Sequence, residues 1–459
     1  MRESTSSTTK SKSVLQARHK NRMIEYELFR TILSDDIVIK KPKSEDLKDE
    51  VDEEDEQYQN HLLKGELLDV IVDEEVTIHE FYLENNTDSA APETHIVIIH
   101  GYMAAMGYFI KNVEPLLKSM PGIRLHLIDL PGFGNSSRPM FPPEFLLEPE
   151  TKQEKIAQII EIENWFIDKI EGWREKREIN HFKLIGHSMG AYLSSCYLMK
   201  YNKEKEDGTK FVEEFLAVSP MGTESSSQSL INDKKYQFNF HETGGDPFHE
   251  LVGDEDEFVS EELKRLWEDL GQPRFPKNYI LEKLWKSNKS PFQILQNLGP
   301  FYSKILSYWS FQRFRNLSAN EEERLMRRGS QPKSISSTTT VDLILQLHNY
   351  SYSIFNQYQG SGEIAITKFI NHQILAKLPL CDRGFVEYLN KTSVKNLWLY
   401  GDKDWMNNKG GLYIHNRVKE LNPDITYYKI IKDAGHHIYL DNPTGFNDCC
   451  IEFFNLQIV

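Results

Sequence analysis

The sequence predicts an α/β fold with a mostly parallel central sheet, helices on both faces of that sheet, and a large inserted cap that is mainly helical. Short apolar segments typical of buried strands recur along the chain, and each ends in a glycine-rich or polar turn. One of them, at 182–187, leads through a glycine-flanked turn into a helix-forming segment. Two more, at 394–400 and 425–431, follow only after a long insertion, which is the pattern of a sheet interrupted by a cap.

The length of the chain fits this organisation. A chain of 459 residues exceeds one compact core, but an α/β core with an inserted cap reaches this size without a second independent domain. We expect a disordered N-terminal region over 1–65 and the first part of the core over 66–222. The cap is expected over 223–389, and the second part of the core over 390–459.

Charge is distributed unevenly along the chain. The formal net charge is −15, but residues 45–56 hold nine acidic residues and one lysine, so the rest of the chain carries only −7. We expect this acidic run to be solvated and disordered. The chain has no basic stripe, which argues against nucleic acid as a partner.

The N-terminal segment has a different composition. Residues 1–23 contain six Lys or Arg and one acidic residue, with several Ser and Thr. This composition fits a mitochondrial transit peptide, but the hydrophobic face is poor, and a disordered basic tail explains the segment equally well. Neither a secretory apolar core nor a run of about 18 apolar residues is found, so we expect no transmembrane segment and only peripheral contact with a membrane.

The strongest candidate for a catalytic motif is Gly186-His187-Ser188-Met189-Gly190. Glycines two residues before and two residues after Ser188 permit the sharp strand-to-helix turn of a nucleophile elbow, which presents the serine side chain. A serine hydroxyl is a weak nucleophile. The motif therefore requires a base, an acid that orients the base, and donors for an oxyanion.

The base and the acid can be assigned after the two later strands. The first of these strands ends in a loop with Asp402 and Asp404, and the second is followed by Gly435 and two histidines. We assign Asp404 as the orienting acid because it lies deeper in its loop than Asp402. We assign His436, which directly follows Gly435, as the base in preference to its neighbour. The order Ser, Asp, His along the chain is that of the α/β-hydrolases.

An oxyanion site is expected upstream of the elbow. The strand at 96–99 ends in His100-Gly101-Tyr102, so we assign the backbone N–H groups of Tyr102 and Met189 as the two donors. The next strand is followed by Asp129-Leu130-Pro131-Gly132-Phe133-Gly134. This segment completes no phosphate-binding pattern, and we interpret it as a structural turn beside the mouth of the site.

Each candidate also has a purely structural interpretation. Ser188 could be a turn serine, Asp404 a turn acid, and His436 one of fifteen histidines. Their arrangement favours catalysis because all three follow predicted strands in the required order. Core packing, by contrast, explains the helix predicted over 152–173, whose apolar residues recur at helical spacing.

The cap is where substrate choice is expected to be determined. Its segment 291–309 is rich in aromatic and aliphatic side chains and is broken at Gly299-Pro300. Such a segment lines an acyl groove, rests on a bilayer or forms the cap's own small core, and the last interpretation is favoured for most of its residues. Residues 316–340 are charged and then rich in Ser and Thr, which is typical of a loop.

Taken together, the motifs resemble an α/β-hydrolase subfamily, and the resemblance extends over nearly the whole chain from about Leu67. This subfamily contains the fungal cardiolipin-specific deacylase, related fungal lysophosphatidic acid acyltransferases, and the animal lipolysis coactivator with its N-acyl phospholipid lipase relative. The blocks specific to the subfamily are Gly401-Asp402-Lys403-Asp404-Trp405-Met406 and Ala434-Gly435-His436-His437-Ile438-Tyr439-Leu440-Asp441-Asn442-Pro443. The coactivators lack the serine, whereas Ser188 is present here.

The resemblance implies a serine-dependent phospholipid acyl hydrolase, similar to a cardiolipin deacylase, that releases a fatty acid and a lysolipid through an acyl-enzyme. Two alternatives stay open: an acyl-coenzyme A-dependent lysophosphatidic acid acyltransferase, and a non-catalytic regulator of another lipase at a lipid surface. A mitochondrial location is expected, with the cytoplasm or a lipid-droplet surface as alternatives. Neither a metal nor an organic cofactor is implied.

The subfamily is also described by a His-x-x-x-x-Asp motif linked to acyl transfer, which here comprises His436 and Asp441. His436 is already assigned as the base, and Asp441-Asn442-Pro443 has the pattern of the cap and first turn of the last helix. We therefore interpret the motif as structural. It does not decide between hydrolase and transferase, because both begin with the same acyl-enzyme and differ only in the acceptor.

The four cysteines, Cys196, Cys381, Cys449 and Cys450, show no C-x-x-C spacing. We therefore expect a reducing compartment and no structural zinc.

Overall fold

The structure is a computed structural model of the 459-residue chain. It describes residues 4–43, 58–204, 208–226, 228–231, 291–297, 299–314, 317, 340–357, 360–371 and 374–456. The acidic run at 45–56 and almost all of the predicted loop at 316–340 lie outside the described residues.

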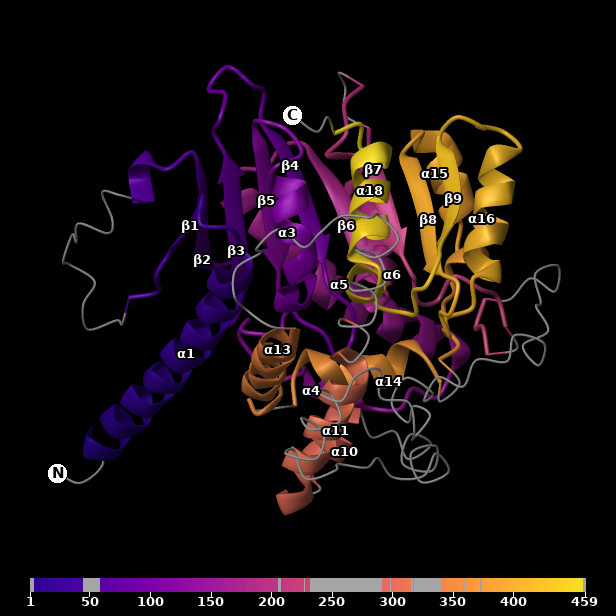
Figure 1. Ribbon diagram of the computed structural model, residues 1–459. Helices are drawn as coiled ribbons and strands as arrows, with labels where there is room; N and C mark the ends of the chain where they lie inside the picture. Colours follow the sequence, from indigo (N-terminus) through magenta and orange to yellow (C-terminus); the bar gives the residue numbers. More distant parts are fainter. Residues whose placement is uncertain are drawn as a thin grey trace.

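The described residues form a nine-stranded sheet with the order β1-β2-β3-β5-β4-β6-β7-β8-β9 (Figure 1). Only the β2–β3 and β3–β5 pairs are antiparallel, and all the other neighbouring pairs are parallel. The strands are β1 (Ile37–Lys40), β2 (Leu63–Ile71), β3 (Thr77–Asn85), β4 (Thr94–Ile99), β5 (Ile123–Ile128), β6 (Phe182–His187), β7 (Val212–Val218), β8 (Lys395–Gly401) and β9 (Thr426–Ile431). The predicted mostly parallel α/β sheet is confirmed.

Helices cover both faces of the sheet (Figure 1). The helices are α1 (Ser4–Ile32), α3 (Ile110–Leu117), α4 (Pro143–Leu146), α5 (Lys152–Lys176), α6 (Met189–Tyr201), α10 (Pro291–Gln296), α11 (Tyr302–Phe314), α13 (Thr340–Phe355), α14 (Ile366–Phe369), α15 (Phe385–Thr392), α16 (Lys409–Lys419), α17 (Ile438–Asp441) and α18 (Pro443–Phe453). Short 3-10 turns lie at η2 (Met106–Phe109), η5 (Gly299–Phe301), η6 (Gly362–Ala365) and η7 (Leu380–Asp382). Helix α3 packs on α18, and α5 packs on α6.

Helix α5 matches the helix predicted over 152–173. Thr151 begins it with a capping box, in which the threonine side chain accepts from the Glu154 N–H and the Glu154 side chain accepts from the Thr151 N–H. Its apolar positions Ile162, Phe166 and Trp173 are fully buried. Core packing therefore accounts for this helix, as expected.

The expected disorder of 1–65 is wrong for much of that region. Helix α1 packs on the protein through Leu28 and Phe29, which are buried together with Leu33 just after the helix, and the Phe29 ring contacts Phe81 of β3 with centroids 4.0 Å apart. Strand β1 then adds to the edge of the sheet in parallel with β2. The physical reason is that burying this short apolar face stabilises the docked segment enough to order it, despite the polar composition of the rest of the segment.

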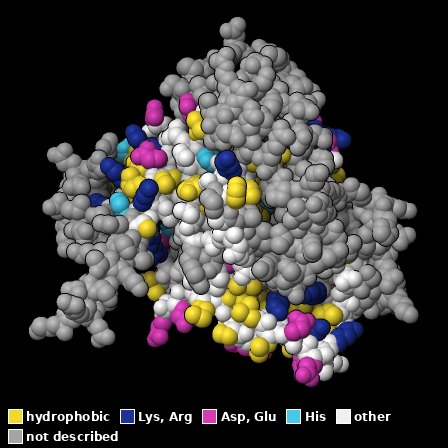
Figure 2. All heavy atoms as spheres, turned by 90° about the horizontal axis from the view of Figure 1, so that it is seen from below, with side chains coloured by type: hydrophobic (Ala, Val, Ile, Leu, Met, Phe, Trp, Pro, Cys, Tyr) yellow, Lys and Arg dark blue, Asp and Glu magenta, His cyan; other side chains and the backbone are white. Residues whose placement is uncertain are grey.

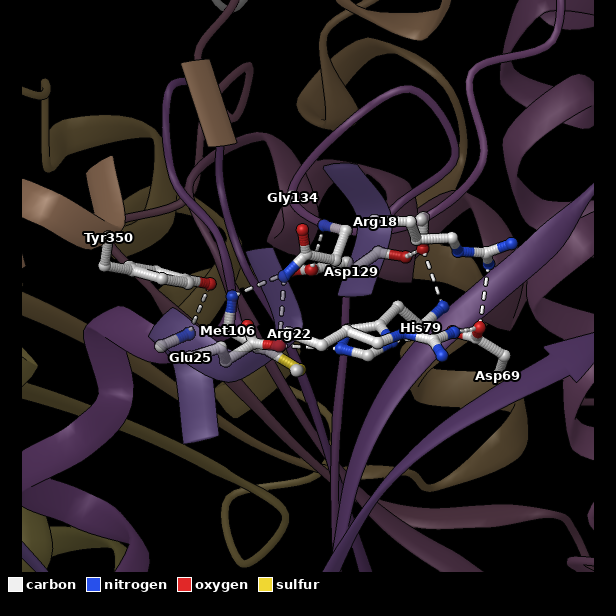
Figure 3. Close-up of polar contacts among 12 residues, drawn as sticks. Arg18, Arg22, Glu25, Asp69, His79, Met106, Asp129, Gly134 and Tyr350 are labelled. Carbon is white, nitrogen blue, oxygen red and sulfur yellow. Dashed lines mark hydrogen bonds and ion pairs between the residues drawn. The ribbon is translucent and has the colours of Figure 1, made fainter. Parts of the chain in front are cut away.

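A buried polar cluster fixes α1 to the sheet (Figure 3). Glu25 of α1 has no exposed surface, and its Oε2 lies 2.7 Å from Nε2 of His79 on β3. The other nitrogen of His79 lies 2.7 Å from Asp69 of β2, and Asp69 pairs in turn with Arg18 and Arg22 of α1. Because buried charged groups are costly unless they are paired, these contacts restrict α1 to a single position.

The boundary between the cap and the second part of the core also differs from the expected one. Helix α15 crosses the predicted boundary at 389/390, and its Phe385 and Leu389 are fully buried. The Phe385 ring packs edge-on to Trp398 of β8. The second part of the core therefore begins before residue 390, because α15 packs on the sheet.

The described part of the cap is helical. Helices α10 and α11 flank the break predicted at Gly299-Pro300, and within them Phe292, Leu306 and Trp309 are buried. These residues belong to the same buried hydrophobic cluster as the strands of the sheet. The apolar side chains of this segment therefore join the main core, whereas a separate small core of the cap was expected. Within the described part of the chain, no helix combines the length and the apolar composition that a bilayer crossing requires.

We predict that Glu25→Ala lowers the free energy of unfolding by about 3 kcal/mol, because it removes one of the two carboxylates that contact the buried His79 and leaves His79 Nε2 without a partner. Glu27→Ala is the matched control on the same helix. Glu27 is exposed, and among the described residues its one ion pair is with Arg30, at 3.7 Å, so its replacement should cost less than about 1 kcal/mol. Urea unfolding of both variants measures the difference, and equal losses would show that α1 is not held by the buried cluster.

Candidate active site

Ser188 occupies a strained turn between β6 and α6. Its backbone has φ 52° and ψ −118°, which is a conformation that residues other than glycine rarely adopt. Such strain costs on the order of 1–3 kcal/mol and persists only where the surrounding structure enforces it. Here the Ser188 N–H donates to the Val218 carbonyl at the end of β7. The turn thus places Ser188 at the carboxyl edge of the sheet, at the beginning of α6.

Two glycines make this turn possible. A Cβ atom on Gly190 would lie 2.3 Å from the carbonyl oxygen of His100, so α6 can approach the end of β4 only with glycine at that position. A Cβ atom on Gly101 would lie 2.9 Å from the Cβ of Ser188. The loop after β4 is therefore in direct contact with the serine.

The structure brings Asp404 and His436 together. The carboxylate of Asp404 lies 3.1 Å from Nδ1 of His436, and both side chains are at most 5% exposed. The same carboxylate oxygen accepts the N–H of Met406, which holds the acid in place. Asp402 instead accepts the N–H of Ala434. Of the two acids in this loop, Asp404 is thus the one that contacts the imidazole.

His187 connects the histidine loop to the elbow. It immediately precedes Ser188, and its Nε2–H donates to the backbone carbonyl of His436 at 3.0 Å. The two imidazole rings lie 4.8 Å apart. Burial, together with the neighbouring His436 and His437, lowers the pKa of His187 well below its ordinary value, so the ring is neutral at physiological pH. Ser188, His187 and His436 are thereby held in one small region.

Asp441 also stabilises the histidine loop. Its carboxylate accepts the N–H of Gly435, one residue before His436, at 2.8 Å. The N-cap of α18 is Asn442, whose side chain accepts the Gly445 N–H, and Pro443 is the first helical residue. The cap is therefore one residue later than Asp441, and Asp441 itself supports the loop that carries His436. This contact gives the His-x-x-x-x-Asp pattern a structural role.

The expected oxyanion donors lie on the two segments that meet at Ser188. Met189 is the first residue of α6, where backbone N–H groups and the helix dipole favour negative charge. Tyr102 directly follows Gly101 in the loop after β4, and its ring packs edge-on to Phe133 with centroids 5.8 Å apart. Both positions are compatible with the predicted roles.

The segment 129–134 is a structural turn, as predicted. Asp129 is fully buried, and its two carboxylate oxygens accept the N–H of Met106 at 2.8 Å and the N–H of Asn135 at 2.7 Å (Figure 3). His100 accepts the N–H of Leu130 at 3.0 Å. These bonds tie the loop after β5 to the loop after β4, close to the elbow.

Arg313 of the cap helix α11 is a residue that sequence reasoning missed. Its guanidinium hydrogen-bonds to Nε2 of His437 and donates to the carbonyl of Met103 at 3.1 Å. It also stacks over Tyr108 and Trp309, 4.6 and 4.7 Å from the ring centroids. A cation from the cap is therefore held beside the histidine loop. No sequence signal marks it, because Arg313 belongs to no motif and precedes His437 by more than 100 residues.

Glu224 is a further buried carboxylate near the site. Glu224 follows β7 and is 3% exposed, and the hydroxyl of Thr223 donates to it at 3.2 Å. Burial raises the pKa of Glu224 to about 7. Tyr400 of β8 is close to both Glu224 and Asp404, and both carboxylates help to raise its pKa above the ordinary value, after the larger effect of burial. Sequence analysis did not select Glu224, because it stands in no recognisable motif.

Sequence comparison relates the chain to known proteins. The profile of a family described as alpha/beta hydrolase fold matches residues 94–443. Some relatives are named as acyltransferases and others as lipases, and the motifs suggest both activities. The predicted resemblance is therefore confirmed.

Three relatives illustrate the range of names and of sequence identities. The chain is 24% identical over 360 residues to the rice (Oryza sativa subsp. japonica) protein named "Probable 1-acylglycerol-3-phosphate O-acyltransferase", covering 78% of this chain and 67% of the relative. It is 27% identical over 407 residues to "Protein ECM18" of Saccharomyces cerevisiae, covering 82% and 74%. It is 26% identical over 366 residues to the human "(Lyso)-N-acylphosphatidylethanolamine lipase", covering 79% and 80%.

We predict that Glu224 makes stability fall as the pH rises from about 4.5 to about 7. In this window the folded protein retains a proton that the unfolded chain releases, so each increase in pH favours unfolding, by on the order of 3 kcal/mol over the whole window. Glu224→Gln, which is neutral at every pH, should remove this slope. Chemical denaturation at several pH values measures it, with exposed Glu213→Gln as the control. An unchanged slope in Glu224→Gln would contradict the prediction.

Proposed function

The chain belongs to the alpha/beta hydrolase fold family, and from this premise we propose that it is a serine-dependent phospholipid acyl hydrolase. It releases a fatty acid and a lysolipid through an acyl-enzyme on Ser188. The observation that carries the proposal is the Asp404–His436 hydrogen bond beside a strained serine elbow. A base, an acid that orients it, and a presented hydroxyl are the groups that acyl transfer to serine requires.

In the proposed reaction, Ser188 Oγ attacks the carbonyl carbon of the acyl ester while its proton passes to Nε2 of His436. Nδ1 of His436 faces Asp404, which fixes the tautomer and stabilises the imidazolium that forms. The ester C–O bond then breaks, and the proton moves to the departing lysolipid oxygen. Water attacks the acyl-enzyme in the same way, which releases the fatty acid and restores the serine.

The backbone N–H groups of Tyr102 and Met189 are proposed to receive the negative charge that develops on the carbonyl oxygen. Loss of one such donor typically raises the barrier by about 2.7–4 kcal/mol. The contact of Gly101 with Ser188 supports this assignment, because it brings the loop after β4 next to the attacking oxygen.

A phosphate-bearing substrate is supported by Arg313. Among the described residues, no carboxylate pairs with this guanidinium, although it lies beside the histidine loop and is held between Tyr108 and Trp309. Arginine forms directional, charge-assisted bonds with phosphate oxygens. The human relative described above is a lipase whose name refers to a phospholipid. We assign Arg313 as a contact for the substrate's phosphate.

Cardiolipin is the substrate that the motif resemblance favours, and a mitochondrial location is proposed with it, on the composition of residues 1–23. Peripheral contact with a membrane is supported by large apolar side chains exposed on the side of the molecule that carries the cap. Met140, Leu147 and Phe301 are 75%, 67% and 63% exposed. Figure 2 looks onto this side from below and shows hydrophobic side chains gathered there, with Lys and Arg among them.

The acyltransferase alternative is supported by the name of the rice relative, "Probable 1-acylglycerol-3-phosphate O-acyltransferase". It uses the same acyl-enzyme and replaces water with a lysolipid hydroxyl as acceptor. The products therefore separate the two reactions, whereas the residues of the site do not.

Incubation of the purified protein with labelled cardiolipin tests the proposal. Release of free fatty acid and monolysocardiolipin is expected, both with and without acyl-coenzyme A and lysophosphatidic acid. A new diacyl lipid that appears only with those two additions would support the transferase instead. The absence of both products would support the non-catalytic regulator.

Site variants test the assigned roles in the same assay. Ser188→Ala should abolish the acyl-enzyme and turnover, and Asp404→Asn should lower kcat by roughly 10⁴-fold, because the imidazole loses its correct tautomer. Asp402→Asn, in the same loop, should retain activity to within a few-fold. An Asp402 variant as inactive as the Asp404 variant would overturn the assignment of the acid.

Arg313→Gln should lower kcat/KM for a phospholipid by about 10- to 100-fold, as expected when a hydrogen bond to a charged group worth about 1.5–3 kcal/mol is lost. Hydrolysis of a neutral short-chain ester should change by less than about three-fold. Arg417→Gln on α16 is the matched control. Equal losses on both substrates would show that Arg313 positions the loop at Met103 and does not bind phosphate.

A further inference from the structure

A cavity lined by residues of α1, of α13 and of the segment 135–138 that follows β5 lies apart from the proposed catalytic residues. Figure 1 shows where α1 and α13 lie in the fold. Its volume is about 920 Å³, within the range of small-molecule sites. None of its lining residues belongs to the serine, acid and histidine constellation. The two helices are packed together although more than 300 residues separate them in sequence, so only the folded chain forms this cavity.

The cavity wall carries an excess of positive charge, although the chain as a whole carries −15. Arg18 is matched by Asp69 (Figure 3), and Glu27, the acidic residue of the lining, is matched by Arg30. Lys20 and Arg138 also line the cavity, and no carboxylate among the described residues lies within ion-pair distance of either. In the described part of the chain, these two positive charges therefore have no acidic partner at the cavity wall.

Arg138 is the more informative of the two. Its Nη atoms donate to Gln357 at 2.9 Å and to the carbonyls of Ser136 and Ile354, but its buried Nε–H has no hydrogen-bond partner in the described structure. Burial lowers the pKa of Arg138 to about 10, against the opposing effect of the more distant Asp129 and Glu363. Arg138 as a whole is only partly buried, but its Nε–H is buried without an acceptor, which is costly unless an anion in the cavity supplies one.

The rest of the lining suits a ligand with a polar head and an apolar chain. Asn21, Asn349 and Asn356 present side-chain amides for which the described residues provide no hydrogen-bond partner. Met23 and Ile24 of α1 supply apolar surface in the same cavity. Polar donors near a pair of cations, next to an apolar wall, match the chemistry of an anionic amphiphile.

We propose that this cavity binds a single-chain lipid phosphate, with the phosphate against Lys20 and Arg138 and the acyl chain along the α1 wall. The site is separate from the proposed catalytic centre and does not require Ser188 to be a nucleophile. It is nevertheless connected to that centre, because Asn135 on its wall donates to Asp129, which also holds Met106 in the loop after β4. A ligand in the cavity is therefore connected, through Asn135 and Asp129, to the loop after β4, which contacts the elbow.

Isothermal titration calorimetry on the full-length Ser188→Ala protein tests the proposal, because this background cannot turn the ligand over. The probes are monomeric lysophosphatidic acid, inorganic phosphate and a fatty acid of the same chain length. We expect lysophosphatidic acid to bind at least ten-fold more tightly than either of the others. Adding Arg138→Gln should weaken its binding at least ten-fold, and adding Lys20→Gln about five-fold.

Lys419→Gln on α16 is the matched control, because Lys419 is an exposed lysine that does not line the cavity. This substitution should leave the affinity for lysophosphatidic acid unchanged. Because Arg138 also donates to Ile354, circular dichroism checks each fold, and Arg138→Lys with Lys20→Gln carries the test if Arg138→Gln unfolds. Unchanged affinity in the Lys20 and Arg138 variants would overturn the site. Inorganic phosphate or fatty acid binding as tightly as lysophosphatidic acid would overturn the lipid phosphate assignment. Both results are independent of any hydrolysis by the unmodified protein.

Discussion

The close approach of α6 to the end of β4 is the constraint on which the candidate site depends. Gly190 lies against the carbonyl of His100, and Gly101 lies against Ser188, so the helix, the serine and the loop after β4 occupy one crowded region. The strained backbone of Ser188 is a consequence of this packing. Without these two glycines, the serine could not be presented at the edge of the sheet. His436 and Asp404 would then have no hydroxyl to activate.

Buried polar contacts hold the remaining loops around that point. Asp129 joins the loops after β4 and β5, His187 joins the elbow to the histidine loop, and Asp441 fixes the turn before His436. Each contact satisfies a backbone group that would otherwise be buried without a partner. The polar network around the site therefore sets the geometry of the loops, while the apolar sheet supplies the rigid frame beneath them.

The candidate site could be predicted from the sequence because its residues stand at strand ends. Ser188, Asp404 and His436 each follow a strand, and a parallel sheet brings its carboxyl ends to one edge. The contact between Asp404 and His436 agrees with this placement, and the catalytic roles stay a prediction. Arg313, Glu224 and the docking of α1 could not be found in this way. Arg313 reaches His437 from a distant helix, and Glu224 matters only because it is buried. Segment composition suggested disorder for α1, whereas a few buried side chains decide its position.

Local patterns along the chain thus determined the fold class, the elbow and the order of the catalytic candidates. Each of these depends on neighbouring residues and on the alternation of strand and helix. Tertiary structure alone decided that α1 packs on the sheet, that Asp441 supports the histidine loop, and that Lys20 and Arg138 face one cavity. These features arise from contacts between segments far apart in sequence, where burial and charge pairing act on residues that no local pattern connects.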